Sequence, residues 1–148
     1  MRDPLRPYRA WFMAAAVYNA LWGTAVSLVP SWFVAIGGLK PATSTVLIQV
    51  IGMMVGVYAY GYYLLARDPI RYQGLIWVGL AGKTLGPLGF FLSALRGDLP
   101  WQFGWVILTN DLVWRPAFWS FALRHARRPL DEPAPSPGTG APGERDGD

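Results

Sequence analysis

The chain has 148 residues, of which 53% are hydrophobic and only 15% are charged, whereas a soluble domain normally carries about 25% charged residues. It has no cysteine and a single histidine, His125, which excludes disulfides, thiol peroxidase chemistry and iron–sulfur clusters and argues against a haem, a conventional zinc centre or a Ser-His-Asp triad. We therefore expect no cofactor and no metal, and we interpret the net charge of +4 as a signal of membrane orientation rather than of a nucleic-acid partner.

Four apolar segments fill most of the chain, at residues 10–29, 45–66, 72–95 and 101–123. Each has about 20 residues or more, the length that a helix needs to cross the hydrocarbon core of a bilayer. The sequence thus predicts an all-α, polytopic membrane protein with four transmembrane helices in an up-down bundle. Residues 1–128 form one domain in this interpretation.

The first segment carries a polar residue, Asn19, at mid-depth. Ala15, Ala16 and Gly23 lie three or four residues from it, so they share its helix face. Small residues on a face allow close helix contact, and we expect Asn19 to point into the bundle. Pro30 ends the segment, and residues 31–36 read as a short amphipathic stretch in the outer interface.

One face of the second segment combines polar and small residues at helical spacing. Gln49, Gly52 and Gly56 fall on it, followed by Tyr60 or Tyr63. Gly52 and Gly56 form a GxxxG pair, which favours helix packing although it is common by chance in apolar helices. We expect this face to look into the bundle.

The third and fourth segments carry opposite charges near their midpoints. Lys83 lies eleven residues past Tyr72, and Asp111 lies ten past Trp101, so both fall about 15–17 Å from an interface, close to the midplane. Because only a few residues join the two segments, they should run antiparallel and bring the two side chains face to face. Arg115 follows Asp111 by four residues and is expected on the same helix face.

These residues define a predicted polar cluster, with Trp114 and Tyr60 as the aromatic side chains most apt to line it. The candidate ligand-binding residues are Lys83, Asp111, Arg115, Asn110, Asn19, Gln49, Trp114 and Tyr60. In one interpretation the cluster only fixes helix packing, since polar contacts between membrane helices contribute about 0.6–2 kcal/mol each. In the other it binds a polar group or moves a proton, because intramembrane charges are functional by default. Two cations against one carboxylate would suit an anionic group, although desolvation could equally leave Lys83 neutral.

Positive charge is distributed unevenly between the two sides. If every segment spans, only Lys40 and Arg96 flank the segments on one side, and eight arginines lie on the other: Arg2, Arg6, Arg9, Arg67, Arg71, Arg124, Arg127 and Arg128. The positive-inside rule then places both termini in the cytoplasm. Residues 129–148 are rich in proline, glycine and acidic residues, a composition that predicts a disordered cytoplasmic tail.

Several stretches resemble a family of small bacterial four-helix membrane proteins of uncharacterised activity. They are IGMMVGVY at 51–58, GLAGKTLGPLGF at 79–90, LPW at 99–101 and TNDLVW at 109–114. The resemblance implies that the polar cluster is a family feature and that the protein resides in the bacterial inner membrane. Family members are sometimes labelled alkyl hydroperoxide reductase, a label that requires a reactive cysteine and does not fit this chain.

Three functions remain open from the sequence, and the absence of a catalytic set leans against an enzyme. The first is a non-catalytic accessory or assembly protein of a membrane complex, acting with a membrane-protein partner or as a homo-oligomer. The second is a binding protein or enzyme for a small lipophilic molecule, held by the Lys/Asp/Arg/Asn cluster. The third is a proton or ion pathway, for which a single titratable pair at one depth makes a poor relay. In each case the lipid bilayer is the surrounding medium.

Overall fold

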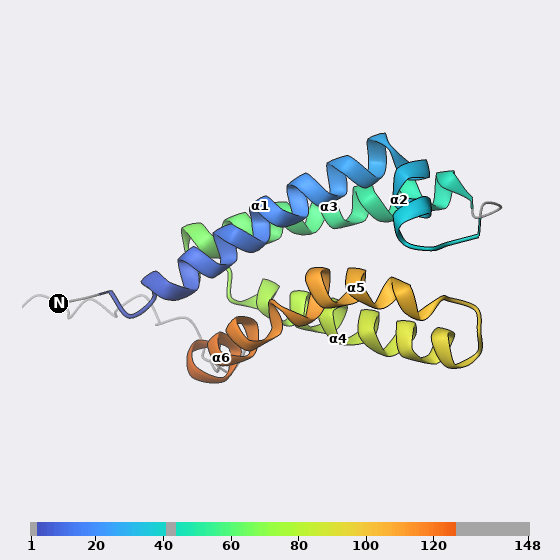
Figure 1. The fold of residues 1–148 in the computed structure, drawn as a ribbon. Helices are drawn as coiled ribbons and strands as arrows, with labels where there is room; N and C mark the ends of the chain where they lie inside the picture. The colour runs from blue at the N-terminus through green and yellow to red at the C-terminus, as the bar shows by residue number, and fades with distance from the viewer. Residues whose placement is uncertain (1–2, 41–43, 127–148) are drawn as a thin grey trace, which may run out of the picture.

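The computed structural model describes residues 3–40 and 44–126, and all of its regular structure is helical (Figure 1). The predicted tail at 129–148 lies outside the described residues. The elements are α1 (Arg6–Leu28), α2 (Pro30–Ile36), α3 (Thr45–Arg67), α4 (Gly74–Leu95), η1 (Trp101–Phe103), α5 (Gly104–Ile107), η2 (Leu108–Leu112) and α6 (Arg115–His125). Two of them, α3 and α4, are long and apolar enough to cross a membrane, and α1 with α2 would make a third span if the bent pair is counted as one.

The chain turns sharply between α1 and α2, whose axes meet at 104°. Pro30 causes the break, because it lacks a backbone N–H and disfavours a helical conformation at Val29 before it. The short helix α2 confirms that a separate stretch follows the break at Pro30. Its buried Phe33 packs edge-on against Trp22 of α1, with the ring centroids 5.1 Å apart.

Helices α1 and α3 run side by side in opposite directions along most of their length (Figure 1). Glycines make this close approach sterically possible. A Cβ atom added to Gly23 would lie 2.7 Å from the carbonyl oxygen of Gly52 and 2.7 Å from the backbone nitrogen of Gly56. The predicted GxxxG pair therefore does pack against a partner helix, and that partner is the Asn19 face of α1.

The fourth apolar segment is not the single helix predicted for residues 101–123. It begins with a turn of 3₁₀-helix in η1, continues as α5, widens into the π-helical η2, and resumes as α6 after Val113 and Trp114. Pro116 contributes to this irregularity, because it has no N–H to donate to the carbonyl of Leu112. In Figure 1 the segment lies beside α4 and bends near its middle.

Two apolar clusters form the interior, one toward each end of the molecule. The larger unites α1, α3, α4 and α6 through fully buried side chains that include Phe12, Leu65, Ile76 and Phe118. The smaller joins α1, α2, α3 and α5 through Val26, Phe33, Val34, Ile48 and Val106. Helices α1 and α3 contribute to both clusters, and on each of them the stretch between the clusters lies near the middle of the helix.

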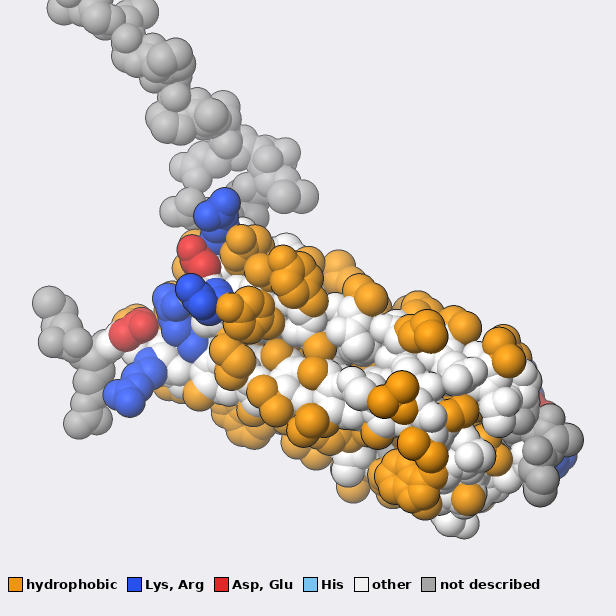
Figure 2. Space-filling view, turned by 90° about the horizontal axis from the view of Figure 1, so that it is seen from above, with side chains coloured by type: hydrophobic (Ala, Val, Ile, Leu, Met, Phe, Trp, Pro, Cys, Tyr) orange, Lys and Arg blue, Asp and Glu red, His pale blue; other side chains and the backbone are white. Residues whose placement is uncertain are grey.

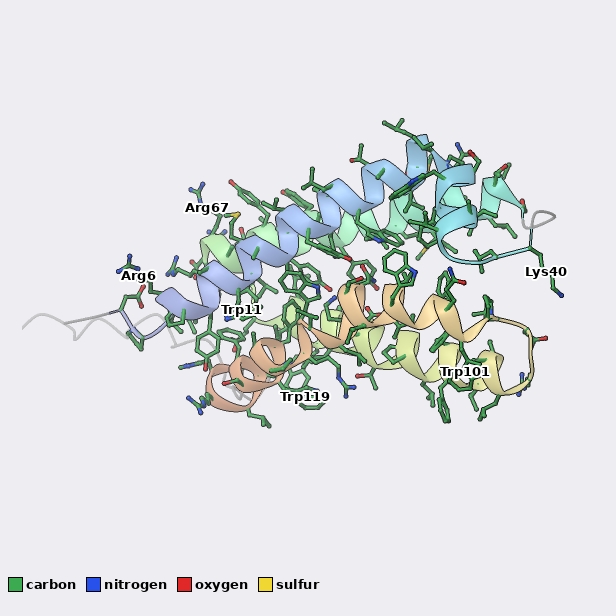
Figure 3. The ribbon with its side chains drawn as sticks, in the orientation of Figure 1. Arg6, Trp11, Lys40, Arg67, Trp101 and Trp119 are labelled. Carbon is green, nitrogen blue, oxygen red and sulfur yellow. The ribbon has the colours of Figure 1, made fainter. Side chains whose placement is uncertain are left out.

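The outer surface matches a chain surrounded by lipid. Large apolar side chains stay exposed along α3 and α4, and they cover much of the face seen in Figure 2, where lysine and arginine gather toward one end. Figure 3 places Arg6 and Arg67 at that end and Lys40 at the opposite end. The hydroxyl groups of Tyr8 and Ser120 are hydrogen-bonded at 2.9 Å. This contact connects the start of α1 to α6 at the arginine-rich end.

Candidate functional site

Lys83, Asp111 and Asn110 meet between α4 and η2. Lys83 Nζ donates a hydrogen bond to the carbonyl oxygen of Asn110 at 2.7 Å and lies 3.9 Å from Asp111 Oδ1. Asn110 Nδ2 donates to the same Asp111 oxygen at 3.2 Å. Lys83 is 3% exposed and Asp111 7%, so the charges are shielded from their surroundings and neutralise each other. The predicted face-to-face placement of Lys83 and Asp111 is thus observed.

Two aromatic rings complete the surroundings of the ammonium group. Lys83 Nζ lies 5.3 Å from the centroid of the Tyr62 ring and 5.7 Å from that of Phe118. Both distances fall within the range of favourable cation–π contacts. The lysine side chain is therefore held by a carboxylate, a carbonyl and two rings, which together fix its position.

The irregular backbone of η2 makes this arrangement possible. Val113 N–H donates to the carbonyl of Leu108, five residues back, at 3.1 Å, so the carbonyl of Thr109 loses its usual helical donor. The indole N–H of Trp114 binds that Thr109 carbonyl at 2.9 Å, and the carbonyl of Asn110 accepts from Lys83. Such π-helical insertions occur often at functional sites.

Asn19 joins the cluster from α1 and is only 3% exposed. It lies between the buried Ala16 and the buried Gly23 on one helix face, as predicted. Along α1 this position lies between the two apolar clusters, and on α4 Lys83 follows Leu80 of the larger cluster. The polar side chains consequently form a layer at mid-length of the molecule, with apolar packing on either side.

A cleft of about 370 Å³ opens onto this polar layer. Lys83, Asp111, Asn110 and Asn19 belong to its wall, and the remaining lining residues are apolar, aromatic or glycine: Ile51, Met54, Val55, Tyr58, Tyr62, Gly82 and Gly86. Because the polar residues are largely buried while Ile51 and Met54 are 47% and 58% exposed, the polar groups form the floor and the apolar residues the mouth.

Gly86 keeps the α4 side of this cleft open. A Cβ atom at this position would lie 2.9 Å from Asp111 Oδ2, whereas at Gly89, one turn later, it would meet no atom within 4 Å. Because Gly86 has no side chain, the Asp111 carboxylate can lie beside the cleft without a steric clash. This requirement gives a specific reason for one of the many glycines of α4.

Two predicted site residues lie elsewhere because of η2. Arg115 is half-buried, is not among the described residues that line the cleft, and makes no ion pair within 4.0 Å in the described part of the chain. The π-helical hydrogen bond from Val113 to Leu108 widens this turn, so the regular four-residue spacing that predicted Arg115 on the face of Asp111 does not hold here. Trp114 is buried, but it packs against Tyr18, 5.4 Å between ring centroids, and against Trp11.

Two further predicted residues on α3 are also outside the cluster. Gln49 Nε2 donates to the carbonyl of Ser27 at 3.1 Å and so serves the contact between α1 and α3. Tyr60 is 66% exposed and points away from the interior. The aromatic residues of the cleft are instead Tyr58 and Tyr62, which the sequence analysis missed.

A sequence signal for these tyrosines did exist. Ile51, Val55, Tyr58 and Tyr62 recur at intervals of three and four residues and therefore share a helix face. That face adjoins the one marked by the GxxxG pair, which drew the prediction toward Tyr60. A helix packed between two neighbours uses both faces, whereas the prediction assumed a single one.

The site offers hydrogen bonding and a neutralised ion pair beneath an apolar mouth. In the ranges 3–40 and 44–126, no group of three or more His, Asp or Glu side chains could hold a metal ion. The arrangement can hold and orient the polar end of a lipophilic molecule, and Asp111 could accept a proton from it. Comparisons of the chain with protein-family models, with curated proteins and with solved structures find no match.

Proposed function

We propose that this protein binds a small lipophilic molecule in the cleft between α3, α4 and η2, with its polar end on the Lys83–Asp111–Asn110 cluster and Asn19. The observation that carries the proposal is the cleft of about 370 Å³ whose floor is polar and whose mouth is apolar. Ligand pockets typically have about 300–1,000 Å³, mostly apolar walls and a few placed polar groups. The cleft matches that description.

The proposal includes a position in the bilayer. In it, α1, α3, α4 and the segment from η1 to α6 cross the bacterial inner membrane as an up-down bundle, with both termini in the cytoplasm. The arginine-rich end supports this orientation through the positive-inside rule. Lys83 lies near the middle of the 22-residue α4, so the mouth of the cleft would open into the lipid tails. A lipophilic molecule could then enter sideways without passing through water.

The absence of cysteine from the sequence allows the orientation to be tested with single cysteines. We expect a membrane-impermeant maleimide to label Asp98→Cys in intact spheroplasts, and to label Ile70→Cys only after the membrane is permeabilised. Both positions are exposed in loops at opposite ends of α4. The reverse pattern would contradict the orientation, and equal labelling of both before permeabilisation would contradict a single crossing by α4.

Ligand binding can be tested by native mass spectrometry of the protein extracted directly into polymer-bounded lipid discs. We expect a small molecule bound to the wild type, and about tenfold or greater loss of its occupancy in Lys83→Met, because removing the ammonium group leaves the Asp111 carboxylate and the Asn110 carbonyl of the floor without their partner. Thr84→Val is the matched control, since Thr84 follows Lys83 on α4 but is exposed. It should retain the molecule.

The other outcomes of this experiment also distinguish the proposed binding function from the alternatives. A wild type without any small molecule, or Lys83→Met that retains it fully, would make the proposal wrong. A defined protein partner in place of a small molecule would support the accessory role instead. Size-exclusion profiles of both variants show whether loss of the ligand reflects the site or an unfolded protein.

A further inference from the structure

We infer that the ligand presents a hydroxyl group, aliphatic or phenolic, which donates a hydrogen bond to the floor of the cleft. The inference rests on the proposed binding function and adds the chemical class of the bound group. It comes from the balance of donors and acceptors among Asn19, Lys83, Asn110 and Asp111.

Two acceptors of this floor have no hydrogen-bond partner among the described residues. Asn19 Oδ1 and Asn110 Oδ1 are both buried without a hydrogen-bond partner. Leaving a buried polar atom unpaired is unfavourable, so such atoms in a folded protein call for an explanation. A ligand that donates a hydrogen bond supplies the missing partner. The terminal torsion of an asparagine side chain is broad, so the Asn19 carboxamide can turn to present its oxygen to a ligand in the cleft that it lines.

Lys83 and Asn110 already use donors of the floor within the protein. Lys83 Nζ donates to the Asn110 carbonyl and faces Asp111 Oδ1, while Asn110 Nδ2 donates to that same carboxylate oxygen. A carboxylate or phosphate ligand would lie beside the Asp111 carboxylate and compete with it for these donors, whereas a hydroxyl can donate to an oxygen and still accept from a nitrogen such as Asn19 Nδ2. The Lys83–Asp111 pair carries no net charge, and Arg115 is not in the cleft lining, so the lining itself lacks the cationic surplus that had suggested an anionic ligand.

A hydroxyl group fits better than an ammonium group, although both donate hydrogen bonds. Burying a second cation beside Lys83 would cost desolvation with no second carboxylate in the cleft lining to compensate it. A neutral hydroxyl has a smaller desolvation cost, and its own oxygen can accept a weak contact from the Lys83 ammonium. The volume of the cleft, about 370 Å³, accommodates roughly a dozen groups of water size, at about 30 Å³ each.

Matched probes separate this inference from the proposed function. The wild-type protein in lipid discs is titrated with dodecanol, its methyl ether and dodecanoic acid, and in parallel with para-octylphenol and its methyl ether. Binding is followed by native mass spectrometry. We expect at least one hydroxyl compound to bind about tenfold more tightly than its methyl ether, which cannot donate, and dodecanoic acid to bind no better than the ether. The aliphatic and phenolic pairs show which kind of hydroxyl is preferred.

Variants then show which residues cause the preference for a hydroxyl compound over its ether. Asn19→Leu and Asn110→Leu each remove one unpaired oxygen and should reduce the ratio of hydroxyl to ether binding toward one. Gln73→Leu is the control, because Gln73 Oε1 is also buried and unpaired but lies outside the cleft lining. It should leave the ratio unchanged, so a general effect of deleting an amide is excluded.

The hydroxyl inference and the proposed binding function would be contradicted by different results. Equal binding of hydroxyl compounds and ethers, or preference for the acid, would overturn the hydroxyl inference while the proposed binding function survives. No saturable binding of any probe, with no molecule co-purifying with the wild type, would overturn both. A hydroxyl preference that persists in both leucine variants would remove the two asparagines as its cause.

Discussion

Replacing Asp111 with leucine is expected to lower the free energy of unfolding by about 3 kcal/mol or more, because it leaves the buried charge of Lys83 without a counter-charge. Lys83 lies among Tyr62, Phe118 and apolar packing, where no described acidic side chain other than Asp111 is within 4.0 Å of its ammonium group. Lys83→Met should also destabilise the protein, since it leaves the carboxylate unpaired. In the double variant neither charge is left alone, so we expect it to be more stable than Asp111→Leu.

Equilibrium unfolding in mixed micelles with increasing sodium dodecyl sulfate, applied to a double-mutant cycle, measures this coupling. Asp98→Leu provides the matched control, because Asp98 is an exposed loop residue whose replacement should change stability by no more than about 0.5 kcal/mol. If the effects of the two single variants simply add in the double variant, the two residues do not act as a pair. The polar layer would then contribute through its separate hydrogen bonds.

Replacing Gly23 with alanine is expected to destabilise the protein by about 1–3 kcal/mol, because an added methyl group would push apart the backbones of α1 and α3. The methyl carbon would lie 2.7 Å from the Gly52 oxygen and from the Gly56 nitrogen, and backbone atoms cannot move aside as the end of a long side chain can. The cleft should be affected as well, since Asn19 is one turn away on the same helix face.

Gly56→Ala tests whether this effect is local. A Cβ atom on Gly56 would meet no atom within 4 Å, so this variant should be as stable as the wild type, or slightly more stable because alanine favours helix over glycine. Thermal unfolding followed by circular dichroism compares the two variants in the same lipid discs. Equal loss of stability in both would show that glycine matters there for helix flexibility rather than for the close contact.

The helical content of the chain, and the presence of helices long and apolar enough to cross a membrane, were predictable from sequence. A long apolar segment has few alternatives to a helix in lipid, because a helix satisfies its own backbone hydrogen bonds there. Helical periodicity also placed Asn19 correctly on the buried face of α1 and Gly52 in a helix contact. The approach of Lys83 to Asp111 followed from nothing more than their depth along two adjacent segments.

Tertiary structure decided which further residues surround that pair. The π-helical η2 breaks the regular spacing between Asp111 and Arg115 and leaves backbone carbonyls for Lys83 and Trp114. Sequence periodicity assumes a regular helix and cannot register such an insertion. The same limit applied on α3, where two faces are in contact with neighbours and only the packing of α4 selects Tyr62 rather than Tyr60. The sequence by itself determined that a buried charge pair would lie at mid-length of a helical membrane protein. The backbone irregularity and helix packing decided that it forms the floor of a cleft, because hydrogen bonds and contacts between distant segments set the rotation of each helix.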